Sequence, residues 1–249
     1  MFAKMRLSLT FSFTKKLILP FHYNEIIQGL IYRLLDKAIA EKLHDEGFVL
    51  GKRKFKLFTF SRLFGNFERQ GENLKFFSPF KFYLSSPYNE MIESLALNLL
   101  KAPEIKILEN KILVESIEVV ASPVIKREVT VKMLSPLTVY STLLSPDGKK
   151  KTYYYHPKEK EFSQLVKENL FKKYKAFYGK IPPSEEFHIE PLGISNKNEK
   201  LVIYKGFIIK GWMGKFRLRG NPELIKFSYE AGLGAKNSQG FGMWEILKK

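Results

Sequence analysis

The stretch NPELIKFSYEAGLGAKNSQGFGMWEILKK, Asn221 to Lys249, ends the chain and decides the fold of its second half. Its first part predicts a helix, because Asn221 is a good N-cap and Pro222 stands at the first helical position. Its last residues, from Phe241 onward, predict a short strand. Between them, GLGAKNSQGFG (Gly232 to Gly242) carries four glycines. This helix–loop–strand unit is the last part of an order of elements that extends over the whole chain.

The sequence before Asn221 supplies the remaining elements of a β-α-β-β-α-β unit. Helical spacing of apolar residues and a stop at Gly179 and Pro182 predict a long helix. A hairpin is expected around Lys205–Gly206. The predicted elements are a strand at 128–140, the helix at 159–179, a strand at 186–194 and the hairpin strands within 200–220.

The first half of the chain repeats the same order. Alternating apolar and polar residues predict strands, and apolar residues at helical spacing predict two helices, each with an asparagine near its start. The predicted elements are a strand at 5–13, a helix at 23–43, strands at 54–64, 74–79 and 81–86, a helix at 88–102 and a strand at 112–120. The fold class is therefore α+β, with two tandem ferredoxin-like domains at 1–122 and 123–249.

The composition favours a polyanionic partner. The formal charge is +17, from 42 Lys and Arg against 25 Asp and Glu, and most of the excess lies in the second half. A basic face is the usual footprint of nucleic-acid binding. The competing interpretation is a lysine-rich thermophilic surface, in which glutamate would rise together with lysine.

Several function classes are disfavoured. The chain has no cysteine, and its four histidines have no metal-ligand spacing, so we expect neither disulfides nor a bound metal. The N-terminus reads as a strand rather than a signal peptide, and the longest uncharged stretch is too short to span a bilayer. We expect a cytoplasmic protein with no membrane partner.

The glycine-rich stretch is not a nucleotide fingerprint. It follows a helix instead of opening one, and it lacks both the Gly-Lys-[Ser/Thr] ending and the third glycine of the dinucleotide motif. Glycines can turn backbone N–H groups outward and allow close approach of a ligand. The expected contacts to a phosphodiester backbone are Gly232, Gly234, Lys236, Asn237, Ser238, Gln239 and Gly240. The alternative is a merely tight connection.

The same stretch resembles the C-terminal glycine-rich signature of the CRISPR-associated endoribonuclease 6 family, within the RAMP superfamily. YNEIIQGLIYRLL (23–35), FKLFTFS (55–61) and PPSEEFHIE (182–190) also resemble that family. The resemblance implies two ferredoxin-like domains, no cofactor and cleavage of CRISPR precursor RNA within each repeat without a metal ion. It implies repeat RNA, single-stranded or hairpin, as partner, and other CRISPR-associated proteins as further candidates; monomer and homodimer both stay open.

Many members of that family use a tyrosine, a histidine and a lysine for the reaction, and the matching residues here are Tyr32, His44 and Lys56. Metal-free RNA cleavage needs a base for the 2′-hydroxyl, an acid for the leaving 5′-oxygen and a cation for the charged phosphorane. His44 is the strongest of the three, because histidine exchanges protons near neutral pH. Boundary packing is the alternative for Tyr32, a solvated strand end for Lys56, and His22 is a rival histidine.

Further basic residues are expected to contact RNA. Lys52, Arg53 and Lys54 lie next to Lys56, while Arg217 and Arg219 alternate with apolar residues and so share one strand face. A merely solvated face is the alternative for the arginines.

Three functions follow from these observations. The first is a metal-independent endoribonuclease that matures CRISPR RNA, leaving 2′,3′-cyclic phosphate and 5′-hydroxyl ends. The second is a catalytically silent family member or structural subunit that holds the repeat, against which the presence of His44 argues. The third is a general single-stranded RNA-binding protein.

Overall fold

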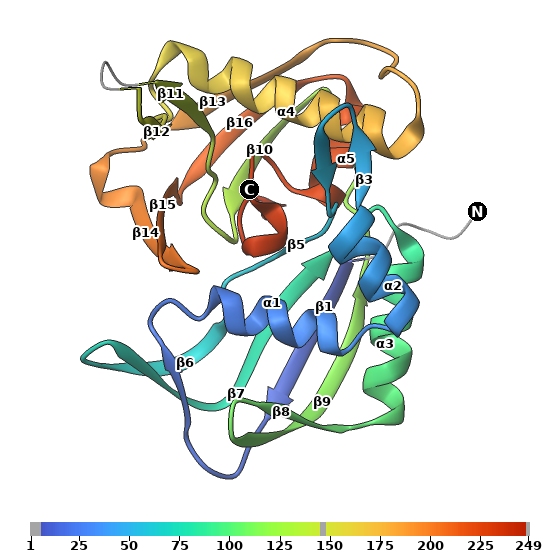
Figure 1. Ribbon diagram of the computed structural model, residues 1–249, viewed down its shortest axis with the longest axis vertical. Helices are drawn as coiled ribbons and strands as arrows, with labels where there is room; N and C mark the ends of the chain where they lie inside the picture. Colours follow the sequence, from blue (N-terminus) through green and yellow to red (C-terminus); the bar gives the residue numbers. More distant parts are fainter. Residues whose placement is uncertain (1–5, 145–147, 248–249) are drawn as a thin grey trace.

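The computed structural model describes residues 6–144 and 148–247, and it contains two β-α-β-β-α-β units stacked one above the other (Figure 1). In the first unit, the sheet order is β2-β7-β1-β9-β8, with β5 and β6 also paired to β7. In the second unit, it is β13-β16-β10-β17. Both sheets place the first strand of the unit beside the third and fourth. The predicted α+β class is therefore confirmed, and the two sheet orders are consistent with the predicted repetition of the unit.

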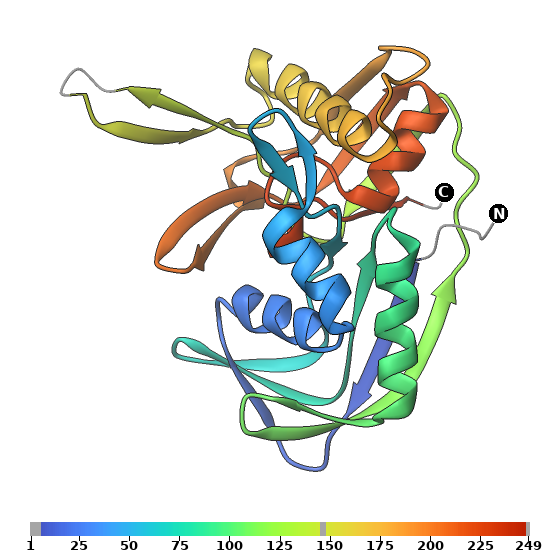
Figure 2. The same cartoon turned by 45° about the vertical axis from the view of Figure 1, so that its right-hand side comes forward.

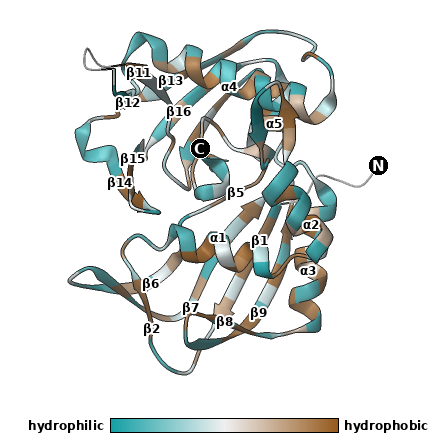
Figure 3. Ribbon diagram, in the orientation of Figure 1, coloured by the Kyte–Doolittle hydropathy of each residue, from teal (hydrophilic) through white to brown (hydrophobic). Residues whose placement is uncertain are grey.

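The first unit begins with β1, whose alternating residues Leu7, Leu9 and Phe11 are buried against helices α1 and α3. Apolar residues run along the strands of both sheets in Figure 3.

The elements of the first unit are β1 Arg6–Ser12, β2 Leu17–Pro20, α1 Asn24–Arg33, α2 Lys37–Glu41, a π turn Lys42–Glu46, β3 Phe48–Leu50, β4 Arg53–Phe55, β5 Thr59–Phe60, β6 Phe64–Gln70, β7 Asn73–Ser85, α3 Asn89–Lys101, β8 Glu104–Ile107 and β9 Asn110–Val120.

The predicted continuous helix at 23–43 was wrong, because the chain breaks between α1 and α2. Side chains of α3 bind the backbone groups that the break releases. Asn98 donates to the Leu34 carbonyl at 3.1 Å, and the Asp36 N–H donates to Ser94 Oγ at 2.9 Å. These bonds satisfy polar groups that an uninterrupted helix would have paired internally. The break redirects the chain that carries His44.

The second unit buries its sheet under α4 and α5. Phe162 of α4 stacks on Phe216 of β16, with ring centroids 6.3 Å apart. The predicted cap of α5 is present, since Asn221 Oδ1 accepts from the Glu223 N–H at 2.8 Å. The elements are β10 Glu128–Met133, β11 Tyr140–Leu144, β12 Lys150–Tyr154, α4 Lys160–Tyr178, β13 Phe187–Leu192, a 3₁₀ turn Asn196–Asn198, β14 Glu199–Tyr204, β15 Phe207–Trp212, β16 Lys215–Gly220, α5 Pro222–Ala231, a 3₁₀ turn Asn237–Gln239 and β17 Trp244–Ile246.

Two hairpins project from the second unit, and one of them corrects the predicted strand at 128–140. That strand ends at Met133, and the chain resumes as β11, which pairs with β12 in a hairpin that stands out from the body (Figure 2). The intervening residues pair with another strand, because the Leu137 N–H donates to the Trp212 carbonyl at 2.9 Å. The second hairpin, β14–β15, turns at Lys205–Gly206 as predicted.

The two units are joined by buried polar contacts. The guanidinium of Arg6 donates to the carbonyls of Tyr229 at 2.7 Å and Trp244 at 2.8 Å, and lies 3.5 Å from the centre of the Tyr229 ring. The β3–β4 hairpin of the first unit also lies against α4 of the second (Figure 2). Phe48 on this hairpin packs against Phe177, with ring centroids 5.2 Å apart. The hairpin therefore carries basic residues of the first unit to the surface of the second.

Candidate nucleic-acid interface and active site

The glycine-rich loop lies at the junction between the two units. At Gly234, a Cβ atom would lie 2.4 Å from the Thr138 carbonyl oxygen, and at Gly240 it would lie 2.6 Å from the Phe60 ring. Both glycines also have a positive φ, which a side chain would strain. Gly232, Gly234 and Gly240 are buried. These glycines therefore permit close packing of the loop against both units.

The first unit holds the glycine-rich loop in place through hydrogen bonds from side chains of α1. Asn24 Nδ2 donates to the Gln239 carbonyl at 2.7 Å, and Gln28 Nε2 donates to the Ser238 carbonyl at 2.6 Å. Tyr204 of β14 donates in turn to the Gln28 amide oxygen. The loop backbone is thus fixed relative to the helix that carries Tyr32.

The second unit pins the loop through Lys173 of α4, which is 2% exposed. Its ammonium donates to the carbonyl of Gly232, to the carbonyl of Gly234 at 3.2 Å and to Asn237 Oδ1 at 3.0 Å. Asn237, 8% exposed, donates to the Leu233 carbonyl at 2.8 Å and the Phe241 carbonyl at 3.0 Å. The Asn237 side chain therefore stabilises the conformation of the loop through these hydrogen bonds.

A cleft of about 700 Å³ lies beside this loop, between the β4 segment, β11 and α4. Basic side chains dominate its charged lining. They are Arg53, Lys54, Lys56, Lys172 and Lys236, with Glu168 as the acidic member. Lys173 also borders the cleft, but its ammonium is bound to the loop. Ala235, Asn237 and Ser238 of the loop and the ring of Tyr140 also line it. The cleft therefore brings basic residues of both units and one side of the loop into one concave surface.

The three candidate catalytic residues come from three different segments, and each contacts one of the others. The ring centroids of Tyr32 and His44 are 5.8 Å apart in an edge-on arrangement. The ammonium of Lys56 donates to the backbone carbonyl of His44. Lys56 lines the cleft, and the His44 side chain is 71% exposed. The break after α1 and the connection between β4 and β5 produce this arrangement.

The charges around these residues are paired locally. His44 Nδ1 lies 2.6 Å from Asp45 Oδ1, and this hydrogen bond holds the pKa of the Asp45 carboxyl below its usual range. Burial, and to a smaller extent Tyr204 and Asp45, raise the pKa of the Tyr32 phenol. Burial and then the neighbouring Lys54 lower the pKa of Lys56. Tyr32 therefore keeps its proton at neutral pH and can act as a hydrogen-bond donor.

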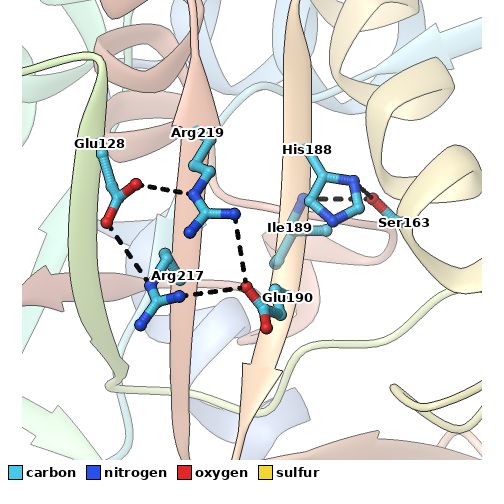
Figure 4. Close-up of polar contacts among 7 residues, drawn as sticks. All are labelled: Glu128, Ser163, His188, Ile189, Glu190, Arg217 and Arg219. Atoms are coloured by element: carbon cyan, nitrogen blue, oxygen red, sulfur yellow. Dashed lines mark hydrogen bonds and ion pairs between the residues drawn. The ribbon is translucent and has the colours of Figure 1, made fainter.

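Arg217 and Arg219 lie outside the cleft, on the face of β16 opposite Phe216 and Leu218. Figure 4 shows both arginines between Glu128 of β10 and Glu190 of β13. Arg219 Nε lies 2.7 Å from Glu128 Oε2, and Arg217 lies 3.4 Å from Glu190 Oε2. The shared strand face predicted for them is confirmed by the burial of the alternating residues. Their charge is balanced by facing carboxylates on both neighbouring strands.

Some of the remaining residues predicted to contact RNA line the cleft, and others do not. Lys52 is exposed in the β3–β4 turn and does not line the cleft, whereas Arg53 and Lys54 do. Ser238 lines the cleft, while Gln239 faces α1 through its carbonyl. His22 lines a separate cavity of about 380 Å³ with Arg62 and Arg69. The structure thus separates the two histidines that the sequence left as rivals.

Sequence reasoning missed Lys172, Lys173 and Tyr140 as cleft residues. Lys172 and Lys173 lie in a helix whose many lysines look alike in sequence, and Tyr140 lies in the segment predicted as one continuous strand. The sequence did contain a signal for Lys173, because it lies at helical spacing on the same face of α4 as the buried apolar residues. A lysine on a core face requires buried acceptors.

Neither a cluster of potential metal ligands nor a helix able to span a membrane is found in the described part of the chain. Among residues 6–144 and 148–247, no three His, Asp or Glu side chains gather as they would around a metal ion. Within the same ranges, no helix has the length and apolar character needed to cross a bilayer.

These features define the class of the protein, a tandem ferredoxin-like protein with a basic cleft suited to a polyanion. Residues 18–118 match the model of CRISPR-associated protein Cas6, N-terminal, and residues 120–246 match that of CRISPR associated protein Cas6, C-terminal. The chain therefore belongs to the CRISPR-associated Cas6 family. The family predicted from the glycine-rich stretch is therefore confirmed.

Relatives of known name are similar over most of the chain. The CRISPR-associated endoribonuclease Cas6 of Pyrococcus furiosus is 34% identical over 233 residues, covering 91% of this chain and 83% of that protein. CRISPR-associated endoribonuclease Cas6 1 of Methanocaldococcus jannaschii is 30% identical over 248 residues, covering 96% and 91%. The solved structure of a Cas6-related gene product from Pyrococcus furiosus has a TM-score of 0.86 at 27% identity, covering 99% of this chain and 100% of that chain.

Proposed function

We propose that this protein is an endoribonuclease that cleaves CRISPR precursor RNA within its repeats, without a metal ion. One observation carries the proposal: the rings of Tyr32 and His44 lie edge to face, and Lys56, whose ammonium donates to the His44 carbonyl, lines a basic cleft. The endoribonuclease names of relatives that are similar over nearly the whole chain support the same activity. We propose repeat RNA as the occupant of the cleft.

The reaction uses the 2′-hydroxyl of the RNA as nucleophile. Its oxygen bonds to the adjacent phosphorus while the bond from phosphorus to the 5′-oxygen breaks. The 2′ proton passes to a base, and an acid gives a proton to the leaving oxygen. The products are a 2′,3′-cyclic phosphate and a 5′-hydroxyl, so the step needs no outside reactant.

The geometry suggests how the roles are divided. The His44 side chain is exposed, and imidazole is the side chain that most often serves as a general acid or base, so His44 serves proton transfer. Tyr32 stays protonated, so its hydroxyl orients the 2′-hydroxyl or a phosphate oxygen as a donor. The Lys56 ammonium stabilises the charge that develops on the phosphorane. Asp45, hydrogen-bonded to His44 Nδ1, fixes the orientation of the imidazole.

We further propose that residues 1–122 and 123–249 form the two domains. Most members of one core cluster precede Val120, and most members of the other follow Glu128. Leu57 belongs to the second cluster, which fits the crossing of the β3–β4 hairpin from one unit to the other.

A cleavage assay in EDTA tests the proposal, with repeat RNA from the host array and a matched RNA carrying one 2′-deoxy substitution 5′ to the cut. We expect a single cut in EDTA that the substitution abolishes. Cleavage that requires added metal would contradict the mechanism. Tight binding without any cut would assign the protein to the RNA-holding members of the family.

A further inference from the structure

Lys173 is a buried cation directly beside the glycine-rich loop. A lysine ammonium has three N–H donors, and here each has an acceptor in the loop, at Gly232, Gly234 and Asn237. Removing an ammonium from water costs several kcal/mol unless its partners are well placed. Burial accordingly lowers the pKa of Lys173 to about 7. A methionine or leucine would fill this place without that cost, so the ammonium needs an explanation.

The acceptors are groups that the loop cannot satisfy by itself. Gly232 is the C-cap of α5, where helix carbonyls lack internal partners and carry a negative partial charge. Asn237 connects this end of the loop to the other, because its amide donates to the carbonyls of Leu233 and Phe241. Lys173 and Asn237 together therefore bind carbonyls from both arms of the loop.

The same loop forms a wall of the basic cleft. Lys236 has a positive φ of 60°, and its ammonium lies 5.0 Å from the centre of the Tyr140 ring. Lys236 and Ser238 line the cleft on either side of Asn237. The bonds made by Lys173 and Asn237 thus set the backbone conformation from which both cleft residues project.

We propose that Lys173 is a positioning residue for RNA binding, which holds the glycine-rich loop in the shape that presents Lys236 and Ser238 to the RNA. It acts through the loop, because its donors are occupied by loop acceptors and its side chain is buried. The proposal rests on the proposed function, in which RNA occupies the cleft. A positioning role differs from a purely structural one in its effect on RNA affinity. If Lys173 were purely structural, its replacement would lower the stability of the fold and leave the RNA affinity of the folded protein unchanged.

The test compares Lys173→Met with Leu170→Ala in the full chain. Leu170 lies on the preceding turn of α4 and is buried in the core of the second unit, so its truncation destabilises the fold without changing the loop acceptors. The measurements are the thermal midpoint, the Kd for repeat RNA with a 2′-deoxy block, and the single-turnover cleavage rate at saturating RNA. All are made below the midpoint of the least stable variant.

We expect Lys173→Met to weaken RNA binding at least ~10-fold, a change of ~1.4 kcal/mol, while the rate at saturating RNA changes less than about threefold. Leu170→Ala should bind within about twofold of the wild type. Equal affinities for the two variants would overturn the positioning role. Failure of the wild type itself to bind the RNA would overturn the proposed function and this inference together.

Asn237→Ala gives a second route if Lys173→Met does not fold. It removes one acceptor of Lys173 and both bonds from the Asn237 amide, so it should weaken binding by a similar factor. In the double variant, the effects should be much smaller than additive, because the two residues act as one unit. Independent, additive effects, or an Asn237→Ala variant with wild-type affinity, would contradict the proposal.

Discussion

The cleft and the outer face of β16 are both rich in basic residues, but they differ in what those residues contact. On β16, Arg217 and Arg219 are held between Glu128 and Glu190, so their charges are balanced within the protein. In the cleft, Lys54 and Lys56 donate to backbone carbonyls, which carry no net charge. Lys236 lies over the Tyr140 ring.

From this difference we expect the neighbours of a basic residue, more than its type, to decide whether it binds a polyanion. A phosphate that approaches Arg217 must compete with carboxylates already bound to it. A phosphate in the cleft meets cations from both units on a concave surface, where low-dielectric walls strengthen the attraction. We therefore propose the cleft as the RNA-binding surface and expect the β16 arginines to stabilise the sheet.

The largest expected effect comes from His44→Ala. Removing the proton-transfer group should slow single-turnover cleavage at least ~100-fold, while the Kd for repeat RNA stays within about threefold. His22→Ala, in the separate cavity, is the matched control and should cleave at nearly the wild-type rate. A comparable drop in affinity in His44→Ala would make the residue a binding contact.

The next largest effect is expected for the double variant Lys54→Ala, Lys236→Ala. Both cations line the cleft, one from each unit, so their removal should raise the Kd at least ~10-fold. The slope of log Kd against log salt should fall by about 0.7 for each phosphate of a single strand that the protein no longer neutralises. An unchanged salt slope would show that these lysines do not neutralise phosphates.

Tyr32→Phe should reduce cleavage about fivefold by removing one hydrogen bond, equivalent to ~1 kcal/mol. The pKa of Tyr32 is raised by burial, so the phenol keeps its proton throughout the neutral range and is not the group that titrates there. The pH–rate profiles of the wild type and Tyr32→Phe should therefore have the same shape from about pH 5 to about pH 9, all below the ordinary pKa of tyrosine. A basic limb that vanishes in the variant would identify Tyr32 as the base.

The smallest effect on binding is expected for the double variant Arg217→Ala, Arg219→Ala. Its Kd should change less than about twofold, because both charges are already paired. Removing both arginines leaves Glu128 and Glu190 facing each other across β16, so the thermal midpoint should fall by a few degrees. A drop in RNA affinity as large as that of the Lys54→Ala, Lys236→Ala variant would show that Arg217 and Arg219 bind RNA despite their paired carboxylates.

The order of elements followed from the sequence because local patterns specify it. The cap at Asn221, the stop at Gly179 and the turn at Lys205–Gly206 all depend on residues close in the chain. The break after α1 did not follow, because it depends on Ser94 and Asn98 in a distant helix. The strand predicted at 128–140 failed for the same reason, since Leu137 pairs with Trp212 instead.

The site was predictable to a similar extent. Resemblance to the family named Tyr32, His44 and Lys56, and the structure brings them near one another, although their roles stay predictions. The pairing of Arg217 and Arg219 escaped notice because Glu128 and Glu190 come from other strands. Lys173 was hidden among the lysines of α4, since only the folded loop shows that its ammonium has buried acceptors.

Ultraviolet cross-linking of a 2′-deoxy-blocked repeat RNA to the wild-type protein, followed by mass spectrometry of the peptides, tests most directly where RNA binds. We expect cross-links to cleft peptides, above all those that contain Phe55 and Tyr140, which line the cleft. Salt that weakens binding should remove these cross-links in parallel. Cross-links concentrated on the β16 peptide with Arg217 and Arg219, and absent from the cleft, would contradict this expectation.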